Sequence, residues 1–399
     1  MDSAVDSADL AQSEGVRRYS MALAVLATAG MVGHGLAMTV TGPVLPEIMR
    51  QFGVRETAAG ILLASGSLGF MAGCLLGGFV TDEVGLKPVL ITTWVGVAAA
   101  LAGCALAGSF VLLMIAYACL GIASGVLETG LNILPAQVGG GAGLMNVIHM
   151  GFGVGALSAP AIAGYALETG LGWRLPYLLV AAVPIVLLLW ALPVSMPAAP
   201  RHTLHEQRQP ILKLLRHPLV LLSAAGLLFY VAAELSISNW IVLFMGQRFE
   251  LPPMQASLSL SVYWGLILVG RLLQGPLSQR FSLPALVVTS SVAFGVGILG
   301  IARSGTSATA FAFLVLAGLG ASGLYPNIMI YANGRYLRQI GAVTGVLSMT
   351  AAAGSFAFQP IVGRVAELYG LELAFLGLVG CTLLVALSYL PVWLGRVRD

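Results

Sequence analysis

The sequence predicts an all-α integral membrane protein, on the evidence of its composition and its long apolar runs. Of the 399 residues, 58% are hydrophobic and only 9% are charged, whereas soluble domains carry about 25% charged residues. Apolar runs such as residues 177–192 and 285–302 recur along the whole chain. Such runs are long enough to cross about 30 Å of hydrocarbon as helices. Strand-length alternation of the outer-membrane barrel type is absent, so the predicted fold class is helical.

Charged and turn residues divide the chain into twelve expected transmembrane helices. Their approximate ranges are 19–45, 57–81, 87–107, 109–136, 142–168, 173–195, 217–247, 254–279, 283–303, 306–334, 340–367 and 372–395. A polar segment rich in Pro, Arg and His separates the sixth helix from the seventh. We therefore expect four parts: a cytoplasmic tail over 1–18, a six-helix bundle over 19–195, a cytoplasmic linker over 196–216 and a second six-helix bundle over 217–399. The polar first part of the tail is expected to be disordered.

The basic residues indicate how the chain is oriented in the membrane. If both termini are cytoplasmic, twelve of the nineteen Lys and Arg residues fall in cytoplasmic segments and six fall on the opposite side. Arg271 completes the nineteen and lies inside the eighth helix. Cytoplasmic loops carry such an excess of positive charge. We expect a monomer in the inner (plasma) membrane, surrounded by the lipid bilayer, with both termini in the cytoplasm.

The two sets of six helices resemble each other at a nearly constant offset. The segment "LGIASG" (120–125) returns as "LGASG" (319–323), so that Ser124 matches Ser322 at an offset of 198. Similarly, Pro160 in "GALSAPAIAG" matches Pro360 in "SFAFQPIVG" at an offset of 200. Together these matches predict a parallel six-plus-six duplication, an architecture found in many secondary transporters.

Several function classes are not expected from the composition. The net charge of +3 is small and the basic residues lie in short loops, so no nucleic-acid partner is expected. The four cysteines fall within apolar runs without CxxC spacing and are predicted to be small buried hydrophobic residues. No motif of an intramembrane hydrolase and no output domain of a sensor is visible. We therefore expect neither an enzyme nor a bound cofactor or metal, with a proton gradient as the energy source.

The loop after the second helix reads "GFVTDEVGLK" (78–87). It resembles the GxxxDxxGRK signature of the major facilitator superfamily, with Gly78, Asp82, Gly85 and Lys87 in place and Leu86 where an arginine is usual. In physical terms, Gly78 would allow close helix contact, Asp82 would cap or pair at a helix end, and Gly85 would permit a tight turn. With twelve helices and a central linker, the resemblance covers the entire chain and implies a conformational gating motif here.

A second resemblance lies in the fourth helix. The segment "LETGLN" (127–132) is similar to the LETxxN element of the fucose permease group of sugar and proton symporters. The group's role for this glutamate implies that Glu128 handles protons and sugar. The first helix departs from the group, because it carries no acid before Glu47 and offers His34 as the nearest polar side chain. His34 and Glu128 are thus the candidate proton-coupling residues.

Polar side chains inside apolar helices are the candidate contacts to a solute. A carboxylate in hydrocarbon is costly, so Glu128 is expected to face a cavity, to pair or to be protonated. Asn132 shares its helix face, and in the fifth helix Asn146 shares a face with His149. These groups suit a polyhydroxylated solute. The alternatives are an interhelical hydrogen-bond clamp for Glu128 and a structural hydrogen bond for each histidine.

The second half offers amides and aromatic side chains together with one acid. Its candidate solute contacts are Glu234, Asn239, Trp240, Tyr263, Asn327 and Gln359. Pro326 is expected to interrupt the tenth helix, and opened backbone at such a depth is tolerated chiefly beside a cavity. Interfacial anchoring of the aromatic residues and an ordinary proline kink remain alternatives.

These observations predict a secondary active transporter of a sugar or a similar small polar solute. It would be proton-coupled and would work by alternating access, through rocking of the two bundles. The alternatives are an exporter of drugs or metabolites in the same superfamily and a passive sugar uniporter.

Overall fold

The computed structural model describes residues 2–137, 141–194, 196 and 217–397. Its helices are α1 Asp2–Thr39, α2 Thr41–Phe52, α3 Glu56–Val84, α4 Leu86–Leu106, α5 Phe110–Gln137, α6 Gly141–Glu168, α7 Arg174–Ala191, α9 Pro218–Phe249, α10 Pro253–Arg280, α11 Leu283–Arg303, α12 Ser307–Ala321, α13 Leu324–Arg335, the short 3₁₀ helix η1 Leu337–Gln339, α14 Ile340–Tyr369 and α15 Leu371–Trp393. No strand occurs in this part of the chain, and twelve spans are long and apolar enough to cross a membrane. The predicted all-α membrane fold is confirmed.

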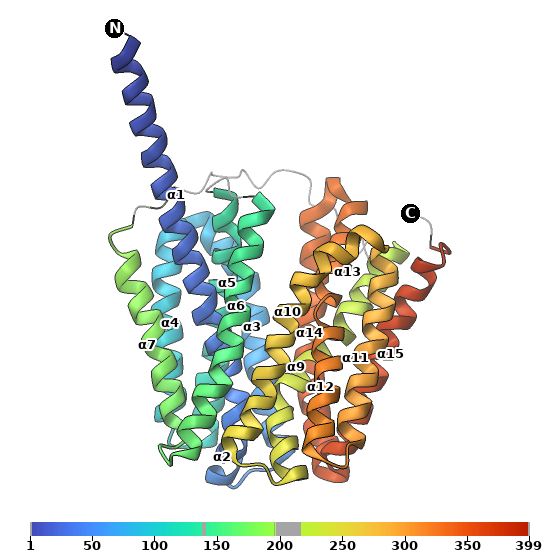
Figure 1. The fold of residues 1–399 in the computed structure, drawn as a ribbon. Coiled ribbons are helices and arrows are strands. Elements are labelled where there is room, and N and C mark those ends of the chain that lie inside the picture. The colour runs from blue at the N-terminus through green and yellow to red at the C-terminus, as the bar shows by residue number, and fades with distance from the viewer. Residues whose placement is uncertain (1, 138–140, 195, 197–216, 398–399) are drawn as a thin grey trace.

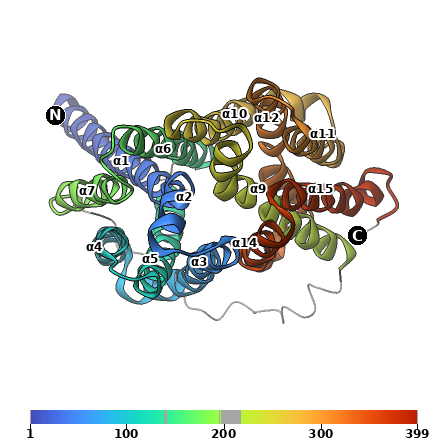
Figure 2. The same cartoon turned by 90° about the horizontal axis from the view of Figure 1, so that it is seen from below.

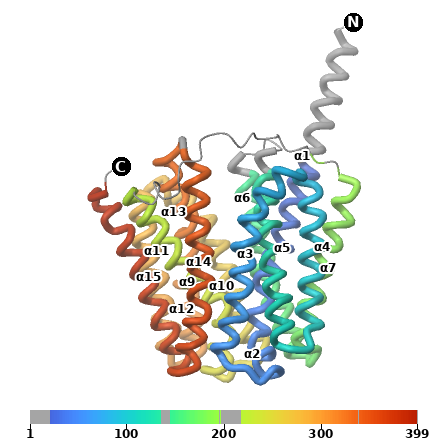
Figure 3. Tube along the Cα trace, turned by 180° about the vertical axis from the view of Figure 1, so that it is seen from behind, coloured from blue at the N-terminus to red at the C-terminus, as the bar shows by residue number. Residues whose placement is uncertain are grey.

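The spans form two bundles that lie side by side. Helices α1–α7 make one bundle and α9–α15 make the other, and both ends of the chain lie at the same end of the molecule (Figure 1). Seen from below, α3 runs beside α14 and α6 beside α10 (Figure 2). These two helix pairs make the most extensive contacts between the bundles, and the view from behind shows the same pairing of α3 with α14 (Figure 3).

The first span consists of two helices, where the sequence predicted one. Helix α1 ends at Thr39 and α2 begins at Thr41. Pro43 accounts for the break, because it has no N–H to donate to the carbonyl of Thr39. Helix α2 continues past Pro46 to Phe52 and ends at Gly53, whose φ of 62° is left-handed.

The tenth span is also broken, just before the proline that predicted the interruption. Helix α12 ends at Ala321 and α13 begins at Leu324. Pro326 lies in the first turn of α13, where its missing N–H costs little. The new helix is established at once, since the backbone N–H of Asn327 donates to the carbonyl of Gly323 at 3.0 Å.

One expectation about the N-terminal tail is wrong. Helix α1 begins at Asp2, so the first part of segment 1–18 is helical and not disordered. The segment contains no proline and a single glycine, and its Ala, Leu, Gln and Glu residues favour helix, so α1 can extend from the first span. Apart from Met196, the predicted linker over 196–216 lies outside the described residues.

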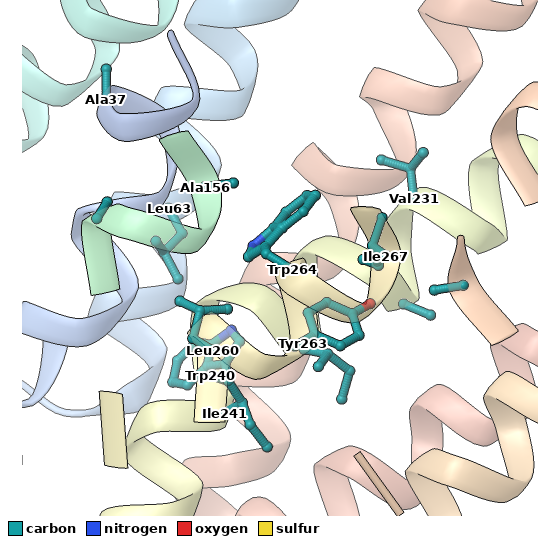
Figure 4. Packing of buried hydrophobic residues seen from close by; sticks show 14 of the residues in the cluster. Ala37, Leu63, Ala156, Val231, Trp240, Ile241, Leu260, Tyr263, Trp264 and Ile267 are labelled. Atoms are coloured by element: carbon teal, nitrogen blue, oxygen red, sulfur yellow. The ribbon is translucent and has the colours of Figure 1, made fainter. Parts of the chain in front are cut away.

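Large aromatic side chains fill the core where the bundles meet. Trp240 and Tyr263 are fully buried and Trp264 nearly so, and Figure 4 shows these three side chains. The ring of Trp264 lies 5.5 Å from the ring of Phe152 in the other bundle, measured between centroids. The indole N–H of Trp264 donates to the hydroxyl of Ser238 at 3.0 Å. Packing at this level therefore joins α6 of one bundle to α9 and α10 of the other.

Candidate functional site

The two residues predicted to couple protons lie against each other in the N-terminal bundle. His34 on α1 and Glu128 on α5 approach to 3.5 Å between Nε2 and Oε2. The side chain of His34 is 2% exposed, whereas that of Glu128 is 30% exposed. The imidazole therefore covers one side of the carboxylate and leaves the other side accessible.

Close packing of α1 against α6 fixes the position of His34. A Cβ atom added to Gly35 would collide with the backbone oxygen of Phe152 and would lie 2.9 Å from the backbone nitrogen of Ala156. The ring of His34 packs against Phe152 and Phe70, with centroid distances of 5.5 and 6.2 Å. Its Nδ1 is buried and has no hydrogen-bond partner in the described part of the chain. The ring thus meets a charged group through Nε2 alone.

Two further predicted residues gather around Glu128. Asn132, one turn later on α5, and His149 on α6 both interact electrostatically with its carboxylate. The side-chain oxygen of Asn132 is buried, and no described residue donates a hydrogen bond to it. Asn146, one turn before His149, is exposed. The N-terminal bundle thus combines a carboxylate, an amide and two imidazoles.

The C-terminal bundle carries a second polar cluster. Glu234 on α9 is 7% exposed and accepts a hydrogen bond from the hydroxyl of Tyr230 at 2.5 Å. It interacts electrostatically with Arg271 on α10, and both groups interact with Tyr263, whose hydroxyl is buried without a hydrogen-bond partner among the described residues. Sequence reasoning placed Arg271 inside the eighth helix but did not assign it to the site, although a basic residue in an apolar span was a sufficient signal.

Electrostatic interactions link the two clusters across the molecule. His149 of the N-terminal bundle interacts electrostatically with Arg271 of the C-terminal bundle. Tyr325 on α13 interacts with both Glu128 and Glu234. The combined site offers a carboxylate and imidazole pair for proton exchange, together with amide, phenol and guanidinium groups for hydroxyl oxygens. In the described residues, no group of three or more His, Cys, Asp or Glu side chains is suited to holding a metal ion.

Trp240 and Gln359, both predicted as solute contacts, bind each other. The indole N–H of Trp240 donates to Oε1 of Gln359 at 2.9 Å, and both side chains are fully buried. The amide nitrogen of Gln359 is buried and has no partner in the described structure. Asn239, next to Trp240 on α9, is half-buried. This pair joins α9 to α14 and leaves one amide group free for a further hydrogen bond.

Asn327, another predicted contact, bonds within its own bundle. Its side-chain nitrogen on α13 donates to Oε1 of Gln274 on α10 at 3.0 Å, and Asn327 is 2% exposed. Gln274 was not predicted, because a single amide near the end of an apolar span looks like an interfacial residue. The hydrogen bond holds α13 against α10 directly after the helix break.

The predicted gating motif contains the expected tight turn at Gly85. Gly85 ends α3 and begins α4 with a φ of 88°, and its backbone N–H donates to the carbonyl of Thr81 at 3.0 Å. Lys87 donates to the carbonyl of Leu192 at 2.8 Å, which ties α4 to the end of α7. Asp82 is exposed.

The expected role of Gly78 in close helix contact is wrong. A Cβ atom added to Gly78 would meet nothing within 4 Å, whereas one added to Gly77 would lie 2.9 Å from Cβ of Thr129 and 3.1 Å from Cα of Val126. The turn of the helix directs Gly77 toward α5 and Gly78 away from it. The preceding glycine therefore provides the close contact.

The fold and the site define a membrane transporter, and comparison with known proteins gives its family. The family described as Major Facilitator Superfamily matches residues 27–358 and 242–399. The chain belongs to this superfamily, and it is a transporter and not an enzyme.

Two relatives show the range of the similarity. An uncharacterized MFS-type transporter of Yersinia pestis is 24% identical over 359 residues, which cover 89% of this chain and 90% of the relative. Sodium-dependent glucose transporter 1A of Mus musculus is 28% identical over 143 residues, which cover 35% of this chain and 34% of that protein. The second match thus spans only about a third of the relative.

Solved structures share the fold at low identity. A D-xylose-proton symporter superimposes with a TM-score of 0.80 at 14% identity, covering 94% of this chain and 97% of that one. A nucleoside transporter gives a TM-score of 0.80 at 13% identity, covering 94% of this chain and 100% of that one. At these identities the likeness establishes the fold alone.

Proposed function

We propose that this protein is a proton-coupled transporter of a sugar or a similar small polar solute in the inner membrane, with both termini in the cytoplasm. The contact between His34 and Glu128 carries the proposal, because it places a titratable pair within the interior of the bundle. Glu128 takes up and releases the proton. The names of the glucose transporter and the xylose symporter among the similar proteins support a sugar-like solute.

His34 supplies the polar partner that the first helix otherwise lacks. Its imidazole can donate a hydrogen bond from Nε2 to the ionised carboxylate of Glu128 and, in its other tautomer, accept one from the protonated carboxyl group. Glu128 therefore keeps a hydrogen-bond partner in both states, and the pair gains one proton when the carboxylate is protonated. A proton reaches Glu128 from the side of the carboxylate that His34 does not cover.

The places where the bundles touch support alternating access. A Cβ atom added to Gly42 would lie 2.9 Å from the backbone oxygen of Ser238, and Arg55 lies 3.5 Å from the carboxylate of Glu367. Both contacts lie in the half of the molecule away from the chain termini. If the termini are cytoplasmic, these contacts block the path to the outside, and transport requires them to open.

The test uses purified protein in lipid vesicles with an inward proton gradient. Accumulation of a labelled sugar that depends on the gradient supports the proposal. Sugar exchange that ignores the gradient identifies a passive uniporter instead. Nitrate belongs in the panel, because a probable nitrate transporter of Staphylococcus aureus is 24% identical over 392 residues, and transport of nitrate but of no sugar contradicts the proposal.

A further inference from the structure

Arg271 and Glu234 carry opposite charges but do not form a direct ion pair in the described structure. They lie on adjacent helices and interact electrostatically, yet no ion pair within 4.0 Å joins them in the described structure, and Arg271 makes no hydrogen bond there. Nε of Arg271 is buried without a partner. Buried charges are normally paired directly and hydrogen-bonded, so both groups retain unused bonding capacity.

The free positions in this cluster match the groups of a sugar. Tyr230 occupies Oε1 of Glu234 and leaves Oε2 as an acceptor, Arg271 offers guanidinium donors, and the hydroxyl of Tyr263 is unpartnered within the described residues. A hydroxyl group can donate to the carboxylate and accept from the guanidinium. The two charges sum to zero, so an uncharged solute leaves the cluster neutral.

We propose that Arg271 is a solute-binding residue, and that the neutral pair of Arg271 and Glu234 selects an uncharged polyol over a sugar acid or an amino sugar. A carboxylate or ammonium group on the solute adds a net charge in an apolar environment, which is costly. The inference rests on the proposed sugar transport and names its solute class. Replacing either Arg271 or Glu234 by a neutral residue is therefore expected to change which solute charge is preferred, because the remaining residue leaves the cluster with a net charge.

The test compares binding of D-glucose, D-glucuronate and D-glucosamine by thermal shift in detergent. Wild-type protein is expected to favour D-glucose, Glu234→Gln to gain affinity for D-glucuronate, and Arg271→Gln to gain affinity for D-glucosamine, each by about tenfold or more. A residue with a merely structural role lowers all three affinities together. Equal losses, or preference of the wild type for D-glucuronate or D-glucosamine, overturn the inference alone. If the wild type binds none of the three, the inference also fails, and the vesicle assay with the wider panel of solutes decides the proposed function separately.

A second inference concerns the closed end of the molecule, where two carboxylates cross between the bundles. Oε2 of Glu367 on α14 accepts a hydrogen bond from the backbone N–H of Thr57 at 3.1 Å. Oε2 of Glu168 on α6 accepts one from the backbone N–H of Met254 at 3.0 Å. Thr57 and Met254 are each the second residue of their helix, α3 and α10. Each carboxylate therefore caps the first turn of a helix in the opposite bundle.

The same local sequence makes both contacts possible. Each glutamate follows a glycine by four residues, Gly164 before Glu168 and Gly363 before Glu367. A Cβ atom added to Gly164 would lie 3.1 Å from Cα of Met254, and one added to Gly363 would lie 3.2 Å from Cα of Gly60. The glycine lets the opposite helix approach, and the glutamate one turn later reaches its free N–H groups.

We infer that Glu168 and Glu367 are a duplicated pair of latches that hold the end opposite the termini closed. A helix N-terminus is partially positive and its first N–H groups lack partners, so a carboxylate there is favourable. Opening this end separates both carboxylates from their helices. The latches therefore stabilise the closed state relative to the open one and leave the fold of each bundle unchanged.

The test measures the distance between spin labels at Leu171→Cys and Gly305→Cys in a variant without native cysteines, since these exposed positions lie in different bundles at this end. Glu168→Ala and Glu367→Ala are each expected to raise the ratio of open to closed protein about fivefold, as for loss of a helix cap, and the double variant by about their product. The glutamine variants, which keep an oxygen acceptor, are expected to shift less.

A matched control is Glu372→Ala at the same end. Glu372 pairs with Arg303 at 3.2 Å within one bundle, so its loss is expected to leave the distance distribution unchanged. A double latch variant with the wild-type distribution contradicts the inference, and so does a control that opens as far as the latch variants.

Discussion

Replacing Glu128 by glutamine tests whether one carboxylate couples the solute to protons. Glutamine matches the size of glutamate and can still hydrogen-bond to His34, but it cannot take up and release a proton. The structure provides one accessible carboxylate in the N-terminal cluster, so one proton per cycle is expected. A gradient of one pH unit then corresponds to about 1.4 kcal/mol, or about tenfold accumulation of the solute.

The assay loads vesicles so that the interior is one pH unit more alkaline and follows labelled sugar to steady state. Wild-type protein is expected to accumulate sugar about tenfold, whereas Glu128→Gln brings the two sides to equal concentration. Exchange of labelled for unlabelled sugar, which needs no net proton movement, is expected to persist in the variant. Glu372→Gln serves as the control, since Glu372 pairs with a surface arginine. Accumulation by Glu128→Gln that equals the wild type refutes the assignment.

Four substitutions test the packing that positions the site. Trp240→Phe removes the donor to Gln359 and leaves a buried amide unpaired, so a loss of about 1–3 kcal/mol is expected in thermal unfolding. Gly85→Ala forces a side chain onto a φ of 88° and is expected to cost about 1–3 kcal/mol, whereas Gly78→Ala, which meets open space, is expected to be neutral or slightly stabilising. Gly35→Leu inserts a side chain into the backbone of α6, and loss of folded protein in size-exclusion chromatography is expected; a normal yield contradicts the close contact.

Much of the fold could be predicted because the membrane imposes simple rules on a sequence. Apolar length determines the spans, and backbone groups in hydrocarbon must bond within helices. The two helix breaks also follow from local chemistry, since Pro43 and Pro326 each lack a backbone donor. The sequence predicted the second break but missed the first, because Pro43 lies near the predicted helix end at residue 45, where a proline signals an end more readily than a break.

The site was less predictable because its contacts join distant parts of the chain. His34 and Glu128 were both candidates, but only the packing of α1 and α5 shows that they meet. Glu168 and Glu367 end two of the predicted helices and were given no role, since their partners are backbone groups that no sequence pattern marks. Arg271 was visible as a charge in an apolar span, and Glu234 was a predicted solute contact. That the two residues interact could be recognised only once α9 and α10 were placed.

The predicted duplication accounts for a similar arrangement of helices with different chemistry in the two bundles. In the N-terminal bundle, α3 meets α5 where Gly77 faces Thr129, and the backbones are close. The corresponding contact in the C-terminal bundle is the hydrogen bond that Asn327 donates to Gln274. Glu128 precedes Thr129 as Pro326 precedes Asn327, so a titratable acid occupies the place of a proline that follows a helix break. Under the proposed function, this divergence would let one half specialise in the proton while the other keeps polar groups for the solute.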